Sequence, residues 1–255
     1  MLSHITVQKL ADWTKAQVFG QENLNSPVTS ITSDTRTLGP GEVFIALKGE
    51  NFDGHHFLQE AIKKGALAII SQVAPDPAVS SRIPFLKVKD SLQAYVDIGR
   101  ALRKSFHGKV IAITGSAGKS STKDMTGVLL GPNTLISPKS FNNLLGVSKT
   151  LCLLNDQTEN LVLEMGMNGL GEIKQMCEQF EPQGGAITNI GDAHIGKLNG
   201  KEGIYRAKKE LFDWLGKSHA PIGIVMNLDD PWVVRASQDA SLTQLKKITY
   251  SAQNP

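Results

Sequence analysis

The stretch KVIAITGSAGKSS, residues 109–121, decides the fold. The apolar, β-branched run over 109–114 predicts a buried strand, and the pattern over 119–130 predicts a helix. The glycine-rich turn between them directs backbone N–H groups and the positive end of the helix dipole toward an anion. The stretch therefore predicts a phosphate-binding loop at the carboxyl end of a strand.

The spacing of this loop departs at one position from the standard P-loop, G-x-x-x-x-G-K-[ST]. That motif would place glycine at position 113, where the chain has Ile113. In such a loop Lys119 would contact the terminal phosphates of ATP, and the Ser120 hydroxyl would bind Mg²⁺. A plain glycine turn before an exposed lysine is the alternative, but a cation there opposes the helix dipole unless an anion partners it. The predicted nucleotide-binding residues are Thr114, Gly115, Ser116, Ala117, Gly118, Lys119, Ser120 and Ser121.

Helices and apolar strands continue to alternate after this loop. The further helix–strand pairs are 143–154 with 161–164, 171–179 with 185–190, and 201–215 with 222–227. Such alternation predicts an α/β fold with a mostly parallel, doubly wound sheet. Ligands of these sheets bind outside the carboxyl ends of the strands. We therefore expect the chemistry just after Thr114, Glu164, Ile190 and Asn227.

The N-terminal part of the chain has a smaller α/β pattern. Short strands are predicted over 28–33, 42–47 and 66–71, with a helix over 55–64. A stretch dense in Pro, Ser and Ala, residues 73–84, marks a long loop or the edge of a domain. After it, Asp90 can cap a helix that runs to about Ser105. We therefore expect two domains, residues 1–84 and 85–255.

Two side chains near predicted strand ends are candidate metal ligands. Glu164 closes the strand LVLE, and His194 follows the next strand, in the segment TNIGDAHIG. A phosphate-bound Mg²⁺ would lie at this edge of the sheet. Taken singly, Glu164 could point into water and His194 could be an ordinary loop residue, and Asp192 is also available nearby.

Lys208 occupies an unusual position in the helix predicted over 201–215. The apolar stripe of this helix, at spacings of three and four, comprises Ile204, Ala207, Leu211 and Leu215. Lys208 falls on that core-facing stripe. A buried lysine shifts toward the neutral amine, and a neutral lysine can capture CO₂ as a carbamate, an oxygen ligand suited to a second Mg²⁺. The alternative is that the stem lies along the core while the ammonium reaches water.

Composition excludes several classes of protein. The chain has 255 residues with 27 basic and 24 acidic side chains, too even a balance to indicate nucleic acid or a membrane surface as partner. Two cysteines, Cys152 and Cys177, cannot form a multi-disulfide scaffold and fit buried thiols in a reducing compartment. No apolar run approaches the roughly 20 residues that span a bilayer, and the start lacks the features of a signal peptide. A soluble cytoplasmic protein is expected.

Eight segments, in order along nearly the whole chain, resemble the Mur ligase family, the ATP-dependent amide-forming enzymes of bacterial peptidoglycan precursor synthesis. They are SDTR (33–36), GEVFIALKGENFDGHHF (41–57), TGSAGKSSTK (114–123), FNNLLGV (141–147), LEMGMNGLGEI (163–173), TNIGDAHI (188–195), AKKEL (207–211) and NLDDP (227–231). The phosphate loop alone is shared widely, but the ordered set is specific to the family. Within it, TNIGDAH and TGSAGKSSTK favour the member that adds a dipeptide over the one that adds the third amino acid.

The resemblance implies roles for residues in both predicted domains. The UDP-sugar would be held by Ser33, Thr35 and Asn51, and substrate or nucleotide would be contacted by Asn142 and Asn143. Lys119 and Ser120 would serve ATP and the first Mg²⁺. The second Mg²⁺ would be surrounded by Glu164, His194 and carbamylated Lys208, and the adenosine would lie near Asn227 and Asp230. Lys119, His194 and Lys208 are thus the implied catalytic residues.

The implied reaction has two steps. The terminal carboxylate of UDP-N-acetylmuramoyl-tripeptide attacks the γ-phosphate of ATP, and the amine of D-alanyl-D-alanine then attacks the acyl phosphate and releases phosphate. No nucleic acid and no membrane insertion are implied, and a monomer is expected. In the family the central domain continues past the NLDDP segment and a third domain follows, so we expect this chain to be a fragment that lacks the C-terminal ligase domain.

Two other functions stay open at this point. A truncated, non-catalytic module would keep affinity for UDP-sugar or ATP without forming an amide. An unrelated P-loop kinase ranks last, because it would leave the SDTR and DGHH segments and the core-facing Lys208 unexplained.

Overall fold

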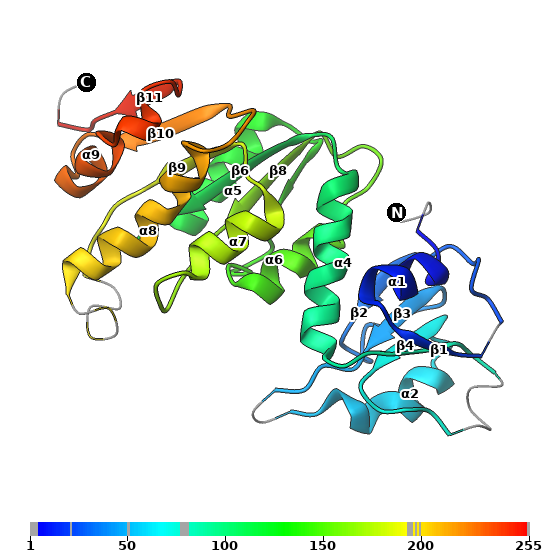
Figure 1. Cartoon of the computed structure of the whole chain (residues 1–255). Coiled ribbons are helices and arrows are strands. Elements are labelled where there is room, and N and C mark those ends of the chain that lie inside the picture. The colour runs from blue at the N-terminus through cyan, green and yellow to red at the C-terminus, as the bar shows by residue number, and fades with distance from the viewer. Residues whose placement is uncertain are drawn as a thin grey trace. The chain divides into compact units, whose positions relative to one another are not determined.

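The computed structural model describes residues 5–20, 22–49, 52–76, 82–192, 196, 198 and 200–253. The chain divides into two compact units, each with its own sheet (Figure 1). Unit 1 comprises Met1–Lys104 and Leu151–Asp156, and unit 2 comprises Ser105–Thr150 and Gln157–Pro255. Among the helices of the described residues, none is both long and apolar enough to cross a membrane.

Unit 1 is built on a five-stranded sheet of order β1-β5-β4-β3-β2. The strands are β1 (Gln17–Phe19), β2 (Ser30–Thr32), β3 (Glu42–Ile45), β4 (Ala68–Ser71) and β5 (Phe85–Lys87). Strands β2 to β5 run parallel, and β1 pairs antiparallel with β5. The helices are α1 (Val7–Thr14), the 3-10 helix η1 (Gly54–Phe57), α2 (Leu58–Lys63) and α4 (Ser91–Ser105).

The central strands of this sheet are continuous apolar runs because both of their faces are covered. In β3, Val43, Phe44 and Ile45 are all buried, and every residue of β4 is buried as well. The predicted cap of α4 is confirmed. The Asp90 carboxylate accepts hydrogen bonds from the backbone N–H groups of Leu92, at 2.7 Å, and Gln93, at 3.0 Å.

Strand β5 shifts the boundary between the two parts of the chain. It pairs with β4 and β1 and so belongs to the first sheet, and unit 1 extends to Lys104. The boundary expected after residue 84 lies ahead of this strand. A three-residue strand is too short for periodicity to assign it to a sheet.

Unit 2 is built on a six-stranded sheet of order β11-β10-β9-β6-β8-β7, and every pairing in it is parallel. The strands are β6 (Lys109–Thr114), β7 (Thr134–Ile136), β8 (Asn160–Glu164), β9 (Gly184–Ile187), β10 (Gly223–Asn227) and β11 (Lys247–Tyr250). The helices are α5 (Lys119–Leu130), α6 (Leu144–Leu151), α7 (Glu172–Phe180), α8 (Lys201–Leu215), α9 (Pro231–Ser237) and the 3-10 helix η2 (Ala240–Leu242).

The order of these strands defines a switch point. From β6 the chain moves outward to β7, returns to β8, and then continues with β9 on the other side of β6. In doubly wound sheets, ligands bind in the crevice outside the carboxyl ends of the strands at such a point. The carboxyl ends of β6, β8 and β9 are therefore where a site is expected.

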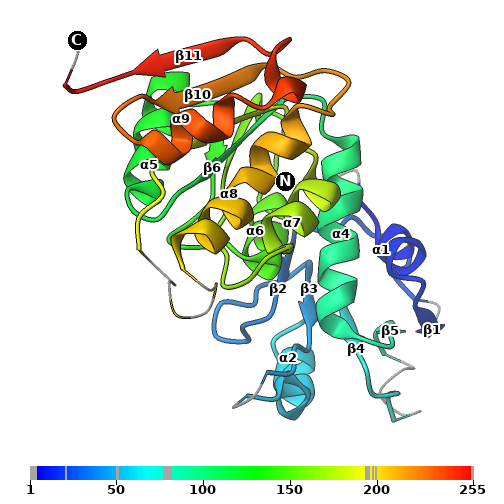
Figure 2. The same ribbon diagram turned by 60° about the vertical axis from the view of Figure 1, so that its left-hand side comes forward.

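Helices α5 and α8 pack on opposite faces of this sheet (Figures 1 and 2). A Cβ at Gly185 would lie 3.0 Å from Leu211 Cδ2 and 3.0 Å from Leu215 Cδ1, so this glycine lets α8 approach β9 closely. On the other face, Ile113 of β6 and Thr126 of α5 help to line an apolar hollow of about 240 Å³. The two faces confirm the doubly wound architecture.

The longest predicted elements are confirmed most closely. Strand 109–114 and helices 119–130 and 201–215 are observed with the same bounds, as β6, α5 and α8. Sequence patterns miss α1, β1, β5, β7, α9 and β11. The strand predicted over 185–190 ends at Ile187, because the backbone beyond it has other partners: the Asn189 oxygen accepts from the Ser116 N–H, and the N–H of Ile190 donates to Asp230 Oδ2 at 2.7 Å.

Candidate functional site

The loop between β6 and α5 depends on two glycines. Gly115 has a φ of +155°, and Gly118, the residue that precedes α5, has a φ of +78°, a region that side chains with a Cβ rarely adopt. At Gly115 a Cβ would also collide with the hydroxyl of Thr188. Gly118 has no side chain to cap α5, so the first N–H groups of this helix are available to bind an anion.

Residues after β9 hold this loop in place. Asn189 accepts hydrogen bonds from two loop N–H groups, that of Ser116 at its backbone oxygen (3.0 Å) and that of Ala117 at Oδ1 (2.9 Å). The Thr188 hydroxyl donates to the Ala117 oxygen at 2.6 Å. These two loop N–H groups are used internally, whereas the N–H groups at the start of α5 have no partner within the helix and are available to a phosphate. Sequence reasoning did not single out Asn189, although it lies in the TNIGDAH segment.

Lys119 and Ser120 begin α5 and point in different directions. The Lys119 ammonium folds back over the loop and donates to the Gly115 oxygen at 2.8 Å. The Ser120 hydroxyl donates to Glu164 Oε2, also at 2.8 Å. The predicted phosphate lysine and the predicted metal-binding hydroxyl are therefore both at the carboxyl end of β6. Ser121, the last residue predicted in this loop, is the third residue of α5 and is exposed.

Glu164 is the centre of a buried polar cluster. It ends β8, is 1% exposed, and faces the loop because β8 pairs directly with β6. Its two carboxylate oxygens have different partners, since Ser120 donates to Oε2 and the Asn142 amide donates to Oε1 at 3.0 Å. The Lys123 ammonium lies 3.9 Å from Oε2. The alternative that Glu164 points freely into water is thus wrong.

Asn142 and Asn143 have different positions. Asn142 reaches Glu164, whereas Asn143 Oδ1 accepts the N–H of Gly146 at 2.8 Å and so supports the first turn of α6. Of the two, the structure brings only Asn142 into the cluster.

Lys208 lies on the buried face of α8, as its spacing predicts. The residue is 2% exposed, and Ile204 and Leu211 beside it are fully buried. Burial, and to a smaller extent the positive charge of Lys119, lowers the pKa of the Lys208 amine from 10.5 to about 7. At neutral pH a large share of this amine is therefore uncharged, as reaction with CO₂ requires.

The donors at this rim suit a divalent cation. A serine hydroxyl and a carboxylate are hard oxygen ligands of the kind Mg²⁺ prefers, and they are 2.8 Å apart at the end of a phosphate loop. Within the described residues, no three His, Cys, Asp or Glu side chains form a ready-made metal cluster. His194, the predicted imidazole ligand, lies outside the described residues.

Asn227 and Asp230 brace the neighbouring strand ends. The Asn227 amide donates to the Thr188 oxygen at 3.0 Å, and Asp230 Oδ2 accepts from Ile190 at 2.7 Å. Asp230 Oδ1 also caps α9 by accepting the N–H of Trp232 at 2.9 Å. Both residues are at the same rim as the loop, and their polar atoms have partners in the protein.

Two of the three substrate residues predicted in unit 1, Ser33 and Thr35, lie in the turn after β2. Thr35 is buried, and its backbone oxygen accepts from the Lys64 ammonium at 2.7 Å. Asp34 and Arg36 beside it form an exposed ion pair at 2.7 Å. Ser33 directly follows β2, and Asn51 lies outside the described residues.

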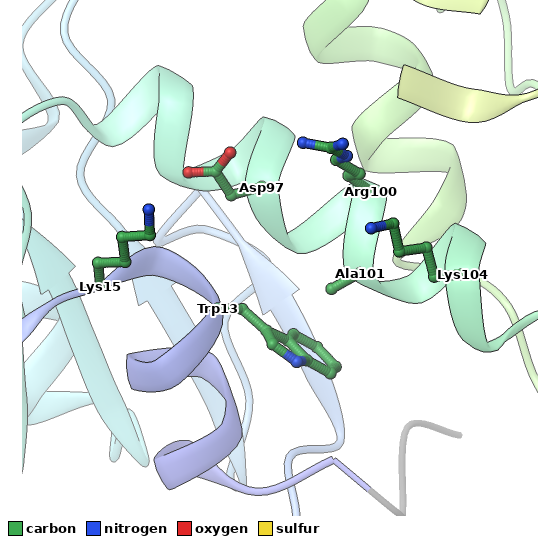
Figure 3. A pocket seen from close by; sticks show the side chains of 6 residues that line it. All are labelled: Trp13, Lys15, Asp97, Arg100, Ala101 and Lys104. Carbon is green, nitrogen blue, oxygen red and sulfur yellow. The ribbon is translucent and has the colours of Figure 1, made fainter. Parts of the chain in front are cut away.

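Unit 1 also has a hollow of about 410 Å³ between α1 and α4, shown in Figure 3. Its lining is Trp13, Lys15, Asp97, Arg100, Ala101 and Lys104. None of the residues predicted to bind substrate is among them.

Comparison with known proteins relates both parts of the chain to one family. Residues 113–255 match the family model described as Mur ligase middle domain, and residues 27–104 match the one described as Mur ligase family, catalytic domain. A UDP-N-acetylmuramoyl-tripeptide–D-alanyl-D-alanine ligase from Bacillus subtilis is 34% identical over 82% of this chain and 46% of its own length. The ligase of the same name from Escherichia coli is 33% identical over 89% of this chain and 48% of its own.

Solved structures give the same relation. The crystal structure of MurF from Acinetobacter baumannii has a TM-score of 0.81 and 31% identity, and the match covers 96% of this chain and 52% of that one. MurF ligase from Thermotoga maritima, solved in complex with ADP, has a TM-score of 0.71 and 26% identity, with 87% of this chain and 50% of that one covered. The chain thus spans about half the length of the relatives it matches.

Proposed function

The chain belongs to the Mur ligase family, and from this premise we propose that it serves an ATP-dependent ligase of peptidoglycan precursor synthesis. The ligase would join D-alanyl-D-alanine to UDP-N-acetylmuramoyl-tripeptide, the substrates in the names of its relatives. Unit 1 would bind the UDP-sugar part, through Ser33, Thr35 and Asn51, and unit 2 would bind ATP. We propose a monomer in the bacterial cytoplasm.

One observation carries this proposal: the phosphate loop and the Ser120–Glu164–Asn142 cluster meet at one rim of the parallel sheet. A loop of this kind binds the phosphates of a nucleotide, and the adjoining oxygen ligands suit Mg²⁺. The relative solved in complex with ADP supports nucleotide binding by this chain.

In the first step, a carboxylate oxygen of the tripeptide attacks the γ-phosphorus of ATP, and the bond from that phosphorus to the β-γ bridging oxygen breaks. An acyl phosphate and ADP result. Both reactants are anions, so their approach needs neutralising charge, which Lys119 and the start of α5 provide. Lys119 would leave its contact with the Gly115 oxygen to meet the phosphates.

In the second step, the amine of D-alanyl-D-alanine attacks the acyl carbon, and the carbon–oxygen bond to phosphate breaks. The amine loses a proton, and an amide and inorganic phosphate are the products. A bound Mg²⁺ would supply charge neutralisation for the transferred phosphoryl group. Ser120 would hold the first Mg²⁺, while Glu164, His194 and Lys208 would hold the second.

Lys208 would take part as a carbamate. Its neutral amine attacks CO₂, a carbon–nitrogen bond forms, and one proton leaves, so that a neutral amine becomes an anion with two oxygen donors. The pKa of about 7 supports this step, because the free amine is the reactive form. Burial of Lys208 protects the product from water.

The test is an assay of phosphate release by this chain with ATP, MgCl₂ and UDP-N-acetylmuramoyl-tripeptide, with and without D-alanyl-D-alanine. A ligase releases phosphate and forms the pentapeptide product only when both substrates are present. Failure to bind ADP at all, measured by calorimetry, would contradict the proposal for unit 2.

A non-catalytic binding module is the second candidate. Such a module would need only the phosphate loop and the Ser120–Glu164–Asn142 cluster, which account for nucleotide binding without amide formation. It predicts ADP binding by unit 2 without phosphate release under any substrate combination.

A further inference from the structure

Helix α5 carries a second lysine, Lys123, one turn after Lys119, and its environment is different. Lys123 is 2% exposed. Its ammonium donates to the backbone oxygens of Ser137, at 2.7 Å, and Lys139, at 2.9 Å. A buried ammonium with partners at this distance is held in one place, because leaving either carbonyl unpaired would be costly.

The carbonyls that Lys123 binds belong to the segment between β7 and Asn142. Ser137 joins this segment to β8, since its N–H donates to the Val162 oxygen (3.0 Å) and its hydroxyl accepts the N–H of Glu164 (3.1 Å). Lys139 has a φ of +50°, a conformation that a residue with a Cβ adopts only when its surroundings impose it. The bond from Lys123 to the Lys139 oxygen is one such constraint.

The segment then places Asn142 against Glu164. The backbone oxygen of Asn142 accepts from Gly166 at 2.7 Å, and its amide donates to Glu164 Oε1 at 3.0 Å. Lys123 approaches the other carboxylate oxygen of Glu164, Oε2, to 3.9 Å. The same ammonium therefore acts on Glu164 directly, as a counter-charge, and indirectly, by holding the chain that leads to Asn142.

We propose that Lys123 is a positioning residue, which holds the Glu164 carboxylate in the orientation that receives Mg²⁺. This role differs from that of Lys119, which would contact the phosphates. This inference rests on the proposed function, because Glu164 is assigned there as a metal ligand. The physical reason is preorganisation: a ligand already held in place loses less conformational freedom when the cation binds. A nearby positive charge alone would weaken Mg²⁺ binding. Removal of Lys123 should therefore strengthen Mg²⁺ binding if only its charge matters, and weaken it if its positioning of Glu164 matters more.

The experiment measures ADP binding by calorimetry over a series of MgCl₂ concentrations, in the parent chain and in Lys123→Met, which keeps the length of the side chain. We expect the MgCl₂ concentration for half-maximal ADP binding to rise about tenfold, with ADP affinity at saturating MgCl₂ changed less than about twofold. An unchanged or lower half-maximal concentration would overturn the proposal.

Three further variants make the test specific. Asp124→Asn removes the exposed carboxylate 3.3 Å from the same ammonium and should leave the Mg²⁺ dependence unchanged. Lys123→Arg, which keeps the charge and the donors, should recover most of the loss, and failure to do so would also count against the proposal. In the double variant Lys123→Met with Asn142→Ala, the effects should be less than additive, because both act through Glu164.

Two outcomes distinguish failure of the proposed role of Lys123 from failure of the proposed function. If the parent chain does not bind ADP in an Mg²⁺-dependent way, the proposed function fails. If the parent does so and Lys123→Met has the same Mg²⁺ dependence, only the role of Lys123 fails. Should Lys123→Met not fold, Lys123→Gln keeps a donor for one carbonyl, and the same rise, smaller in size, is expected.

Discussion

Two carboxylates, one in each unit, show how differently this molecule holds its acidic side chains. Asp34, in the turn after β2, is paired with Arg36 at 2.7 Å, and both side chains are exposed, at 38% and 86%. Glu164, at the end of β8, is 1% exposed and has partners from α5 and from the segment before α6. The exposed pair depends on two neighbouring residues, whereas the buried cluster depends on the whole sheet. Removing one member of a buried cluster leaves the others unsatisfied, so larger effects are expected there.

The largest effect is expected at Lys208. The change Lys208→Ala should abolish phosphate release in the two-substrate assay, and added bicarbonate should not restore it, because no amine remains to form the carbamate. Lys209→Ala is the matched control. Lys209 pairs with Asp213 and Asp239 instead of facing the core, so its removal should leave turnover in place. Parent-like rates in Lys208→Ala would remove the carbamate from the proposed function.

Lys119→Ala should weaken ADP binding about tenfold to a hundredfold, since hydrogen bonds to charged groups contribute about 1.5–3 kcal/mol. The loss should be present at every MgCl₂ concentration, which distinguishes it from the effect expected of Lys123→Met. Calorimetry gives both the ADP affinity and its dependence on the MgCl₂ concentration. Lys174→Ala, which changes an exposed lysine of α7, is the control, and equal ADP affinity in the parent and in Lys119→Ala would refute the phosphate contact.

A smaller effect is expected at Asn189, because its amide stabilises the loop and does not contact the ligand. Asn189→Ala leaves the Ala117 N–H without its acceptor and should lower the free energy of unfolding by about 1–2 kcal/mol. ADP binding should weaken about threefold as the loop loosens. Urea unfolding and calorimetry measure the two effects. Asn133→Ala, which removes an exposed hydrogen bond to Glu159, should change neither the free energy of unfolding nor ADP binding. An Asn189→Ala variant as stable as the parent would contradict this account of the loop.

The smallest effect is expected at Asp34. Hydrogen bonds from the Arg36 side chain and backbone lower the pKa of this carboxyl from 3.8 to about 2. A lowered pKa means that the pair stabilises the folded state above about pH 3.8, and that this contribution is lost as the pH falls toward 2. Asp34→Asn should therefore be slightly less stable than the parent at pH 7, in urea unfolding, and the difference should shrink as the pH falls toward 2. A difference as large at pH 2 as at pH 7 would show that Asp34 acts through something other than its charge.

Some residues of the candidate site could be predicted from the sequence, and others could not. Lys119, Ser120 and Glu164 were predicted from local patterns, because each lies at the junction of a strand and its neighbouring helix or turn, and parallel strands bring such junctions to one edge. Asn189 and Lys123 escaped prediction, since nothing in their own segments distinguishes them. Their roles come from partners 72 and 14 or 16 positions away.

The amino-acid sequence is enough to predict the α/β alternation, the phosphate loop with its two required glycines, the core-facing position of Lys208 and the family resemblance. These features are written within single segments, where periodicity and backbone sterics act over a few residues. Three-dimensional contacts are needed to show that β5 belongs to the first sheet, that Asn142 and not Asn143 reaches Glu164, and that Lys123 is buried beside Glu164. Such contacts depend on strand order and register, which join residues far apart in the chain and which no local pattern contains.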